Sequence, residues 1–287
     1  MKYVLSQRNL KNRKVQNFIA LAISVMCALL GLGLLLVILF DVLRHGISSI
    51  NLELFIKDPA PPTLAEQGGL RSAFLGQGLL TLVASLIGVP LGVLAGTFLA
   101  EYGRNHKYSK VISNLADMAI SVPSIVTGIF IYAILVAPFK GFNGWAGSVA
   151  LAIIILPVIV RTTEEMMSLV PWNLREAAFA LGAPYYKVII SIVWRAAASG
   201  IFTGVLLAIA RVAGETAPLL FTSFNSNFFI LSLNEPVPSL TVTIYQYAAS
   251  PYESWITLAW AAAFVVTIMV LFLNILGRVI IRHKVQG

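Results

Sequence analysis

The sequence is poor in the residues that cross-link a chain, coordinate metals or carry charge. Of its 287 residues, one is a cysteine, three are histidines and 11% are charged. The single cysteine, Cys27, excludes a disulfide within the chain, and the histidines are too scattered to predict a metal site. No Ser-His-Asp or Cys-His arrangement is evident, and the nucleotide-binding motif G-x-x-x-x-G-K-S/T does not occur. We therefore expect that the chain is not an enzyme by itself and binds no cofactor of its own.

Long segments of the chain have no charged residue at all. The sequence is 58% hydrophobic, with a mean hydropathy of +0.86, far from the balance of a soluble domain. Five charge-free runs are each long enough for the roughly 20 residues that cross a bilayer. They cover 15–40, 72–100, 118–139, 141–160 and 254–277. A sixth run, 196–222, is interrupted only by Arg211 and Glu215. The pattern predicts an all-α, polytopic membrane protein with six transmembrane helices.

The runs predict one membrane domain, residues 15–287, after a basic tail of residues 1–14. The six helices are expected at about 15–42, 72–100, 111–138, 146–168, 195–222 and 255–281. A loop at 169–194 would join the fourth and fifth helices, and the two longest loops on the other side would be 43–71 and 223–254. The first apolar stretch, Phe18–Phe40, exceeds the core of a signal peptide and has no small-x-small cleavage site. We expect it to be an uncleaved helix.

Lysine and arginine are unevenly divided between the two sides of this topology. Fifteen lie in the two tails and the second and fourth loops, against four in the alternate loops. The fifteen are Lys2, Arg8, Lys11, Arg13, Lys14, Arg104, Lys107, Lys110, Arg161, Arg175, Lys187, Arg195, Arg278, Arg282 and Lys284; the four are Arg44, Lys57, Arg71 and Lys140. By the positive-inside rule, both termini are expected in the cytoplasm. Topology thus explains the basic pI of about 9.7, and no nucleic-acid partner is needed.

A short polar loop between two apolar runs is the most informative segment. It reads NLREAAFALGAPYYK from Asn173 to Lys187. Asn173 with Glu176 three residues later is typical of a helix N-terminus, and Gly182 followed by Pro184 is typical of a helix end. Four apolar residues would share one face of this helix: Leu174, Ala177, Ala178 and Leu181. The pattern predicts a two-turn helix at the membrane surface whose apolar face docks against a partner.

The apolar run at 196–222 carries two charges at membrane depth. Both charges and the small residues fall within a sector of about 120° on a helix. This sector holds Ala196, Gly200, Gly204, Ala208, Arg211, Gly214, Glu215 and Pro218. Small side chains allow helices to approach closely, so the sector should face the other helices. Arg211 would lie about 24 Å from Arg195, at ~1.5 Å per residue. A charge so deep costs at least ~2.5–3.5 kcal/mol on insertion scales and usually faces a cavity or a partner.

Two hypotheses account for Arg211 and Glu215, which are i,i+4 neighbours. In the first, the two charges neutralise each other and only hold helices together. In the second, Arg211 lines a passage and offers its planar fork of donors to an oxyanion. Glu215 would then accept a proton from the anion or moderate the field. One positive and one negative charge attract a dianion poorly, so a second subunit would have to supply further basic groups.

Two sets of segments resemble known transporters. The loop at 173–187 resembles the EAA loop of permease subunits in ATP-binding-cassette importers, through Glu176-Ala177-Ala178 and Gly182. Other segments resemble the permeases of high-affinity phosphate importers in that class: LAEYG (99–103), SVPSIVTGIF (121–130), VIVRTTEEMM (158–167) and LLAIARVAGETAPLLFT (206–222). The resemblance spans roughly residues 70–287, and ARVAGETAP is its most specific part.

The resemblance implies the six-helix bundle of a type I importer permease in the cytoplasmic (inner) membrane, admitting inorganic phosphate to the cytoplasm. It also implies a sister permease of the PstC kind and two ATPase subunits of the PstB kind, which bind ATP and Mg. A phosphate-binding protein of the PstS kind would deliver the substrate from outside. The implied passage residues are Arg211, Glu215 and Thr216. The implied ATPase-coupling residues are Arg175, Glu176, Ala177, Ala178, Leu181 and Gly182.

Three alternatives remain open from the sequence. The permease could carry another oxyanion, such as sulfate or molybdate. It could instead be a proton-coupled carrier in which Glu215 titrates, or a structural, insertase-like membrane protein. The EAA-like loop argues against the last two, because neither needs an alanine-rich cytoplasmic docking helix.

Overall fold

The chain is built from α-helices interrupted by short π-helical turns in the computed structural model, which describes residues 7–63, 68–103, 106–226, 228 and 232–285. The long helices are α1 (Gln7–Ser48), α3 (Arg71–Thr97), α4 (Lys107–Ser121), α6 (Gly144–Ser168), α9 (Trp194–Val212) and α12 (Glu253–Val285). The short ones are α2 (Glu53–Ile56), α5 (Ser124–Ile131), α7 (Trp172–Ala180), α8 (Tyr185–Val188), α10 (Ala217–Thr222) and α11 (Leu240–Ala248). The π-helical turns are η2 (Phe98–Tyr102), η3 (Tyr132–Val136) and η4 (Ile189–Val193).

The number of apolar helices fits the expected six when one bent pair is counted as a single span. Five described helices are long and apolar enough to cross a bilayer, and α4 with α5 and η3 makes the sixth, bent by 101°. The expected helix at 111–138 is therefore broken rather than continuous. The break falls at Val122, which is extended, and Pro123, because proline lacks an N–H and disfavours helical backbone at the residue before it.

The fifth expected helix, 195–222, is wrong at both ends. Helical structure begins earlier, at Tyr185, so the loop predicted at 169–194 is shorter than expected. At the other end, α9 stops at Val212, and α10 begins after a four-residue break with Pro218 in its first turn. Pro218 explains the break, since its ring would clash with the carbonyl of Gly214 in a continuous helix.

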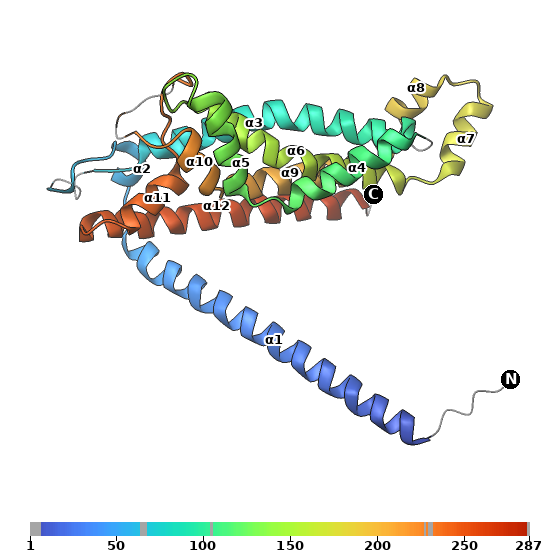
Figure 1. Cartoon of the computed structure of the whole chain (residues 1–287), viewed down its shortest axis with the longest axis horizontal. Helices are drawn as coiled ribbons and strands as arrows, with labels where there is room; N and C mark the ends of the chain where they lie inside the picture. Colours follow the sequence, from blue (N-terminus) through green and yellow to red (C-terminus); the bar gives the residue numbers. More distant parts are fainter. Residues whose placement is uncertain (1–6, 64–67, 104–105, 227, 229–231, 286–287) are drawn as a thin grey trace.

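The first helix is also longer than predicted. It begins at Gln7, so half of the predicted basic tail 1–14 is helical, as lysine, arginine and glutamine are good helix formers. Residues 1–6 of that tail and Arg104 lie outside the described residues, as do 227 and 229–231 of the predicted 223–254 loop. Figure 1 shows that the C-terminal end of α1 lies beside α12 and that α1 diverges from the bundle toward its own N-terminus. At this contact His45 stacks on Trp260, with ring centroids 4.9 Å apart.

The packing of α3 against α6 forms the centre of the bundle. Leu80 and Ala84 of α3 are buried against Leu151, Ile155 and Ile159 of α6. Further along α3, the glycines at 88, 92 and 96 lie on α6. An added Cβ would overlap Ile159 at Gly92 and Thr163 at Gly96. Close approach of this kind is the usual role of small residues between membrane helices.

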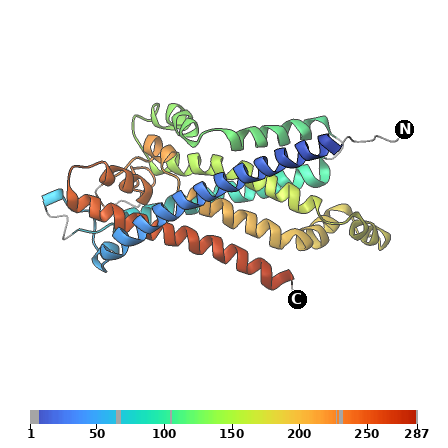
Figure 2. The same ribbon diagram turned by 90° about the horizontal axis from the view of Figure 1, so that it is seen from below.

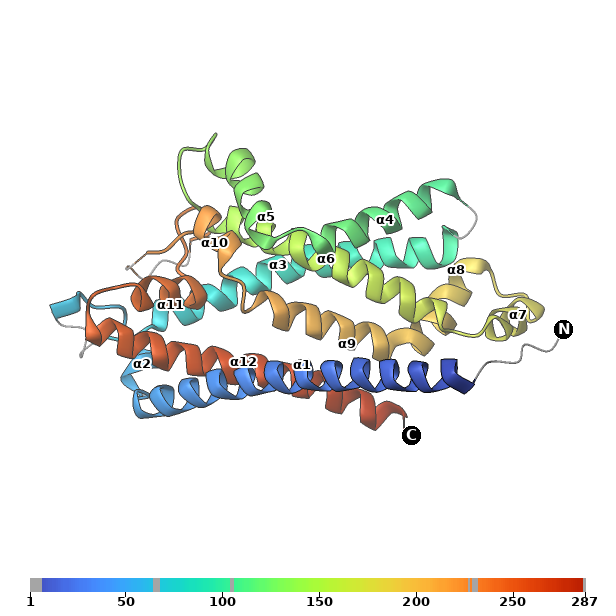
Figure 3. The ribbon, with the colours of Figure 1, turned by 60° about the horizontal axis from the view of Figure 1, so that its bottom comes forward.

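The two ends of the bundle differ. Figure 2 shows α7, the start of α1 and the end of α12 toward one end, and α2 and α11 at the other. The side view in Figure 3 shows the bent α4–α5 span and α10 on one flank, and α12 on the opposite flank. We call these ends the α7 end and the α11 end.

Candidate functional site

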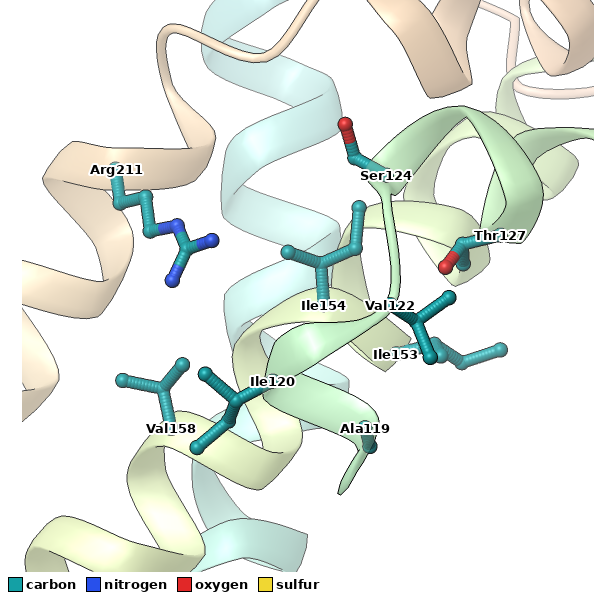
Figure 4. A pocket seen from close by; sticks show the side chains of 9 residues that line it. All are labelled: Ala119, Ile120, Val122, Ser124, Thr127, Ile153, Ile154, Val158 and Arg211. Carbon is teal, nitrogen blue, oxygen red and sulfur yellow. The ribbon is translucent and has the colours of Figure 1, made fainter. Parts of the chain in front are cut away.

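Arg211 lies in the last turn of α9 and is exposed in this single chain. Its guanidinium points from α9 toward the junction of α4 and α5 (Figure 4). The space between them is a cavity of about 130 Å³. The other lining residues come from the α4–α5 junction and from α6: Ala119, Ile120, Val122, Ser124, Thr127, Ile153, Ile154 and Val158. The cavity is therefore mostly apolar, with one cation and two hydroxyl groups.

Arg211 has no acidic partner within the described part of the chain, where the ion pairs all involve other residues. Glu215 lies beyond the end of α9, so the expectation that the two residues share a helical face is wrong. The backbone of Glu215 is held instead, because its carbonyl accepts a hydrogen bond from the Thr241 hydroxyl at 2.8 Å. The hypothesis that Arg211 and Glu215 simply neutralise each other thus loses its geometric basis.

The other two predicted passage residues are close in sequence but not part of the cavity wall. Glu215 and Thr216 are both half-buried, and neither is among the described residues that line the cavity. Thr216 precedes α10, and its carbonyl accepts a hydrogen bond from the N–H of Leu220 at 3.2 Å. Their role in a passage remains a prediction, whereas Arg211 does face a cavity.

Ser124 and Thr127 line the cavity although no sequence motif predicts a role for them. Both lie just after Pro123, in the segment SVPSIVTGIF. The signal that could have identified them is the combination of hydroxyl side chains with a helix-breaking proline in an apolar run. Unwound backbone at membrane depth is tolerated where it lines a cavity or is buried in protein.

The predicted surface helix exists as α7, and its C-terminal end is as expected. Gly182 has a φ of +77°, and its N–H donates to the Phe179 carbonyl at 2.9 Å. The next N–H, of Ala183, donates to the Ala178 carbonyl at 3.1 Å. This pair of bonds is the Schellman motif, in which glycine at the left-handed position ends a helix. The start differs from the prediction, since Pro171 is the N-cap and Asn173 lies within the first turn.

The residues of α7 divide into an inner and an outer face. Arg175 and Ala178 are buried, while Glu176 and Ala177 are exposed. Leu174 and Leu181 also lie outside, with Leu181 89% exposed. The prediction that Ala178 shares an outward apolar face with the other three residues is therefore wrong, because Ala178 packs inward against the bundle. Trp172, Leu174 and Leu181 remain exposed large apolar residues at the α7 end.

Arg175 is the most highly connected side chain at the α7 end, with only 1% exposure. Its Nη2 donates to Glu101 Oε1 at 2.5 Å and its Nε to Oε2 at 3.3 Å. Nη1 also donates to the Val170 carbonyl at 2.7 Å and Nη2 to the Met167 carbonyl at 3.1 Å. We call this group, with its partner Glu101, the Arg175 clamp. Arg175 was predicted as an ATPase-coupling residue, and the structure places its side chain inside the chain rather than on the surface.

A second charged cluster joins α4 to α6. Arg161 Nε lies 2.7 Å from Asp117 Oδ1, and its Nη1 lies 2.9 Å from Glu164 Oε2. The Ser113 hydroxyl accepts a further hydrogen bond from Nη1 at 2.8 Å. This cluster is half-exposed, in contrast to the Arg175 clamp. Across the described residues, no group of three His, Cys, Asp or Glu side chains could hold a metal ion.

Comparison with known proteins places this geometry in context. The family model described as "Binding-protein-dependent transport system inner membrane component" matches residues 88–286. The chain is 49% identical over 281 residues to the "Phosphate transport system permease protein PstA" of Pasteurella multocida, covering 98% of this chain and 99% of that protein. It is 47% identical to the protein of the same name from Haemophilus influenzae, covering 95% of this chain and 96% of that one.

Solved structures show a similar fold at lower sequence identity. A chain of the MetNI methionine ABC transporter, in inward-facing conformations, superposes with a TM-score of 0.58 at 19% identity. The match covers 74% of this chain and 92% of that one. At this identity the comparison speaks for the fold alone.

Proposed function

The chain belongs to the family of binding-protein-dependent transport system inner membrane components, and from this premise we propose that it is the permease subunit of an ATP-driven importer of inorganic phosphate. The observation that supports phosphate as the substrate is the 49% identity, over nearly the full length, to a phosphate transport permease. The family is one of membrane components rather than enzymes, so a partner subunit would bind ATP and Mg and hydrolyse the ATP.

The geometry around Arg211 supports passage of an oxyanion. An arginine that lacks an acidic partner keeps its planar fork of donors for a ligand, and phosphate oxygens match that fork. Its surroundings are mostly apolar, and low polarity strengthens the attraction of a charge for an anion. The hydroxyls of Ser124 and Thr127 would add neutral hydrogen-bonding groups beside the path. A second permease subunit would supply the opposite wall, since one chain alone leaves Arg211 exposed.

The arrangement of the helices supports an orientation. We place the α7 end in the cytoplasm, with both termini, in agreement with the excess of lysine and arginine there. The ATPase dimer would contact the exposed face of α7, and the phosphate-binding protein would dock at the α11 end. Closure of the ATPase dimer on ATP would move α7 and open the bundle outward. Hydrolysis would then return it to the inward-open state and release phosphate.

The test is the uptake of labelled phosphate into cells that contain the partner subunits, comparing the chain with its Arg211→Gln variant at matched membrane levels. Arg195→Gln is a suitable control, because Arg195 is an exposed arginine near the other end of the same helix. Sulfate and molybdate serve as competitors. We expect uptake that ignores both competitors, is lost in Arg211→Gln and persists in Arg195→Gln.

Other outcomes separate the alternatives. Competition by sulfate or molybdate would assign a different oxyanion. Uptake that is abolished by an uncoupler and needs no ATPase partner would indicate a proton-coupled carrier with Glu215 as the titrating group. Uptake that persists in Arg211→Gln would remove Arg211 from the passage.

A further inference from the structure

The attachment of α7 to the rest of the chain depends on few side chains. Of its nine residues only Arg175 and Ala178 are buried, and Phe179 is half-buried. Ala178 belongs to an apolar cluster with Met167, Val188 and Ile189. Contacts of this kind are non-directional, so by themselves they would let a short helix rock or slide over the bundle. The hydrogen bonds of Arg175 add a directional attachment.

The Arg175 clamp joins α7 to the ends of three other segments. Glu101 lies in η2, at the end of α3, and the carbonyls of Met167 and Val170 belong to the end of α6 and the turn after it. On the far side, the Tyr185 hydroxyl donates to the Glu101 carbonyl at 2.9 Å and lies 3.4 Å from Glu101 Oε2. Tyr185 begins the helical run that continues into α9, the helix that carries Arg211.

The π-helical turn η2 directs the side chain of Glu101 toward Arg175. In η2 the three consecutive residues Leu99, Ala100 and Glu101 are all buried, although a regular surface helix would turn one of three outward. The wider turn of a π-helix rotates the following residues relative to an α-helix, and such turns are frequent at functional positions. The carboxylate is thereby directed into the bundle, where Arg175 is its ionic partner.

The geometry restricts motion in a way that apolar contacts do not. A guanidinium has five N–H donors in a fixed plane. The Arg175 guanidinium donates four hydrogen bonds within the chain. Moving α7 relative to Glu101 would leave a buried charge without its partner, which is strongly unfavourable in apolar surroundings. The Arg175 clamp therefore favours movement of α7 together with the ends of α3 and α6.

We propose that Glu101 and Arg175 are positioning residues for energy coupling: they fix α7 to the helix ends, so that displacement of α7 by the ATPase reaches the helices around Arg211. The inference rests on the proposed function, because it requires that an ATPase bind the exposed face of α7. It also divides the predicted coupling residues into two groups. Of these, Ala177 and Leu181 would touch the ATPase, next to the exposed Leu174, whereas Arg175 acts only through Glu101.

The test uses the complete complex with its sister permease, ATPase and binding protein, purified and placed in lipid nanodiscs or vesicles. The variants are Arg175→Lys, which keeps the charge but loses the planar fork, and Glu101→Asp, which shortens the carboxylate. These conservative changes are chosen because removing either charge outright could prevent folding. Asp117→Asn is the control, because it weakens an ion pair of the separate Arg161 cluster. Hydrolysis of ATP with and without phosphate-loaded binding protein is measured per assembled complex, alongside phosphate uptake into the vesicles.

We expect both variants to bind the ATPase and to keep basal ATP hydrolysis within about twofold of the unmodified complex. Stimulation by the loaded binding protein, and uptake per ATP hydrolysed, should fall about tenfold, in the range of typical coupling between sites. Asp117→Asn should change neither quantity by more than about twofold. The proposal would be overturned if both variants kept unchanged stimulation of ATP hydrolysis and unchanged phosphate uptake per complex. The clamp would then be a stabilising ion pair only. If the unmodified complex neither binds the ATPase nor takes up phosphate, the proposed function itself fails.

Discussion

Arg175 and Arg211 both lie among mostly apolar residues, but the two side chains differ in burial and in hydrogen bonding. Arg175 is buried, and four of its hydrogen bonds are made within the chain. Arg211 is exposed, faces a cavity and pairs with no acidic side chain of the described residues. A cation whose donors are satisfied internally contributes to structure, whereas one whose donors are free is available to a ligand or a partner. We infer from this difference that Arg211 is available to a passing anion, whereas Arg175 holds α7 in place.

The largest expected effect on stability is at the Arg175 clamp. Glu101→Gln leaves the Arg175 guanidinium buried without a counter-charge, which is expected to cost about 3–5 kcal/mol. Asp117→Asn, in the half-exposed Arg161 cluster, should cost only about 0–1 kcal/mol. Thermal unfolding of the detergent-solubilised complex, followed by loss of soluble protein on heating, measures both. Equal effects of the two substitutions would mean that burial does not distinguish the clamp from the Arg161 cluster.

The second-largest effect on stability is expected where α5 packs against α10. Gly128 of α5 lies against the backbone of Pro218 in α10, so the Cβ of Gly128→Ala would overlap it and force the two helices apart. Overpacking of this kind costs about 1–3 kcal/mol. Gly78→Ala on α3 is the matched control, because nothing lies within 4 Å of its added Cβ. We expect the first variant to lower the midpoint of thermal unfolding and phosphate uptake, and the second to leave both unchanged; a normal Gly128→Ala protein would contradict the close α5–α10 contact.

The smallest effect is expected at the end of α7. Gly182 has a φ of +77°, and a residue with a Cβ pays about 1–2 kcal/mol in that conformation, so Gly182→Ala should fray the helix end locally. Gly214→Ala is the control, because its nearest neighbour lies at 3.7 Å, an ordinary contact. Limited proteolysis of the 180–184 segment reports this fraying. Cleavage that is no faster in Gly182→Ala than in Gly214→Ala would show that the turn tolerates the change.

The sequence predicted the helices well because their signal is local. Five charge-free runs and a sixth run interrupted only by Arg211 and Glu215 located the apolar spans, and Gly182 correctly marked the end of α7. The errors have local causes as well, since Pro123 and Pro218 interrupt apolar runs that hydropathy treats as continuous. Proline alone does not place such breaks, because Pro90 and Pro157 lie inside the continuous helices α3 and α6.

The clamp could not be predicted in this way. Arg175 and Glu101 are 74 residues apart, and only packing of α3 against α6 brings them together. Helical periodicity placed the four apolar residues of α7 on one face, but it could not tell which part of the helix would face the bundle. In the same manner, the i,i+4 spacing of Arg211 and Glu215 suggested a pair that the end of α9 separates.

The most direct test compares Arg211→Gln and Arg175→Lys in the same complex, measuring phosphate uptake and the midpoint of thermal unfolding for each. We expect Arg211→Gln to abolish uptake while its unfolding midpoint stays at that of the unmodified complex, because the Arg211 side chain forms no ion pair with the residues that the structure describes. Arg175→Lys should lower the unfolding midpoint and weaken uptake without abolishing it. Unfolding of the Arg211→Gln complex at a clearly lower temperature, or uptake that survives in it, would contradict the assignment of Arg211 to the passage and of Arg175 to the structure.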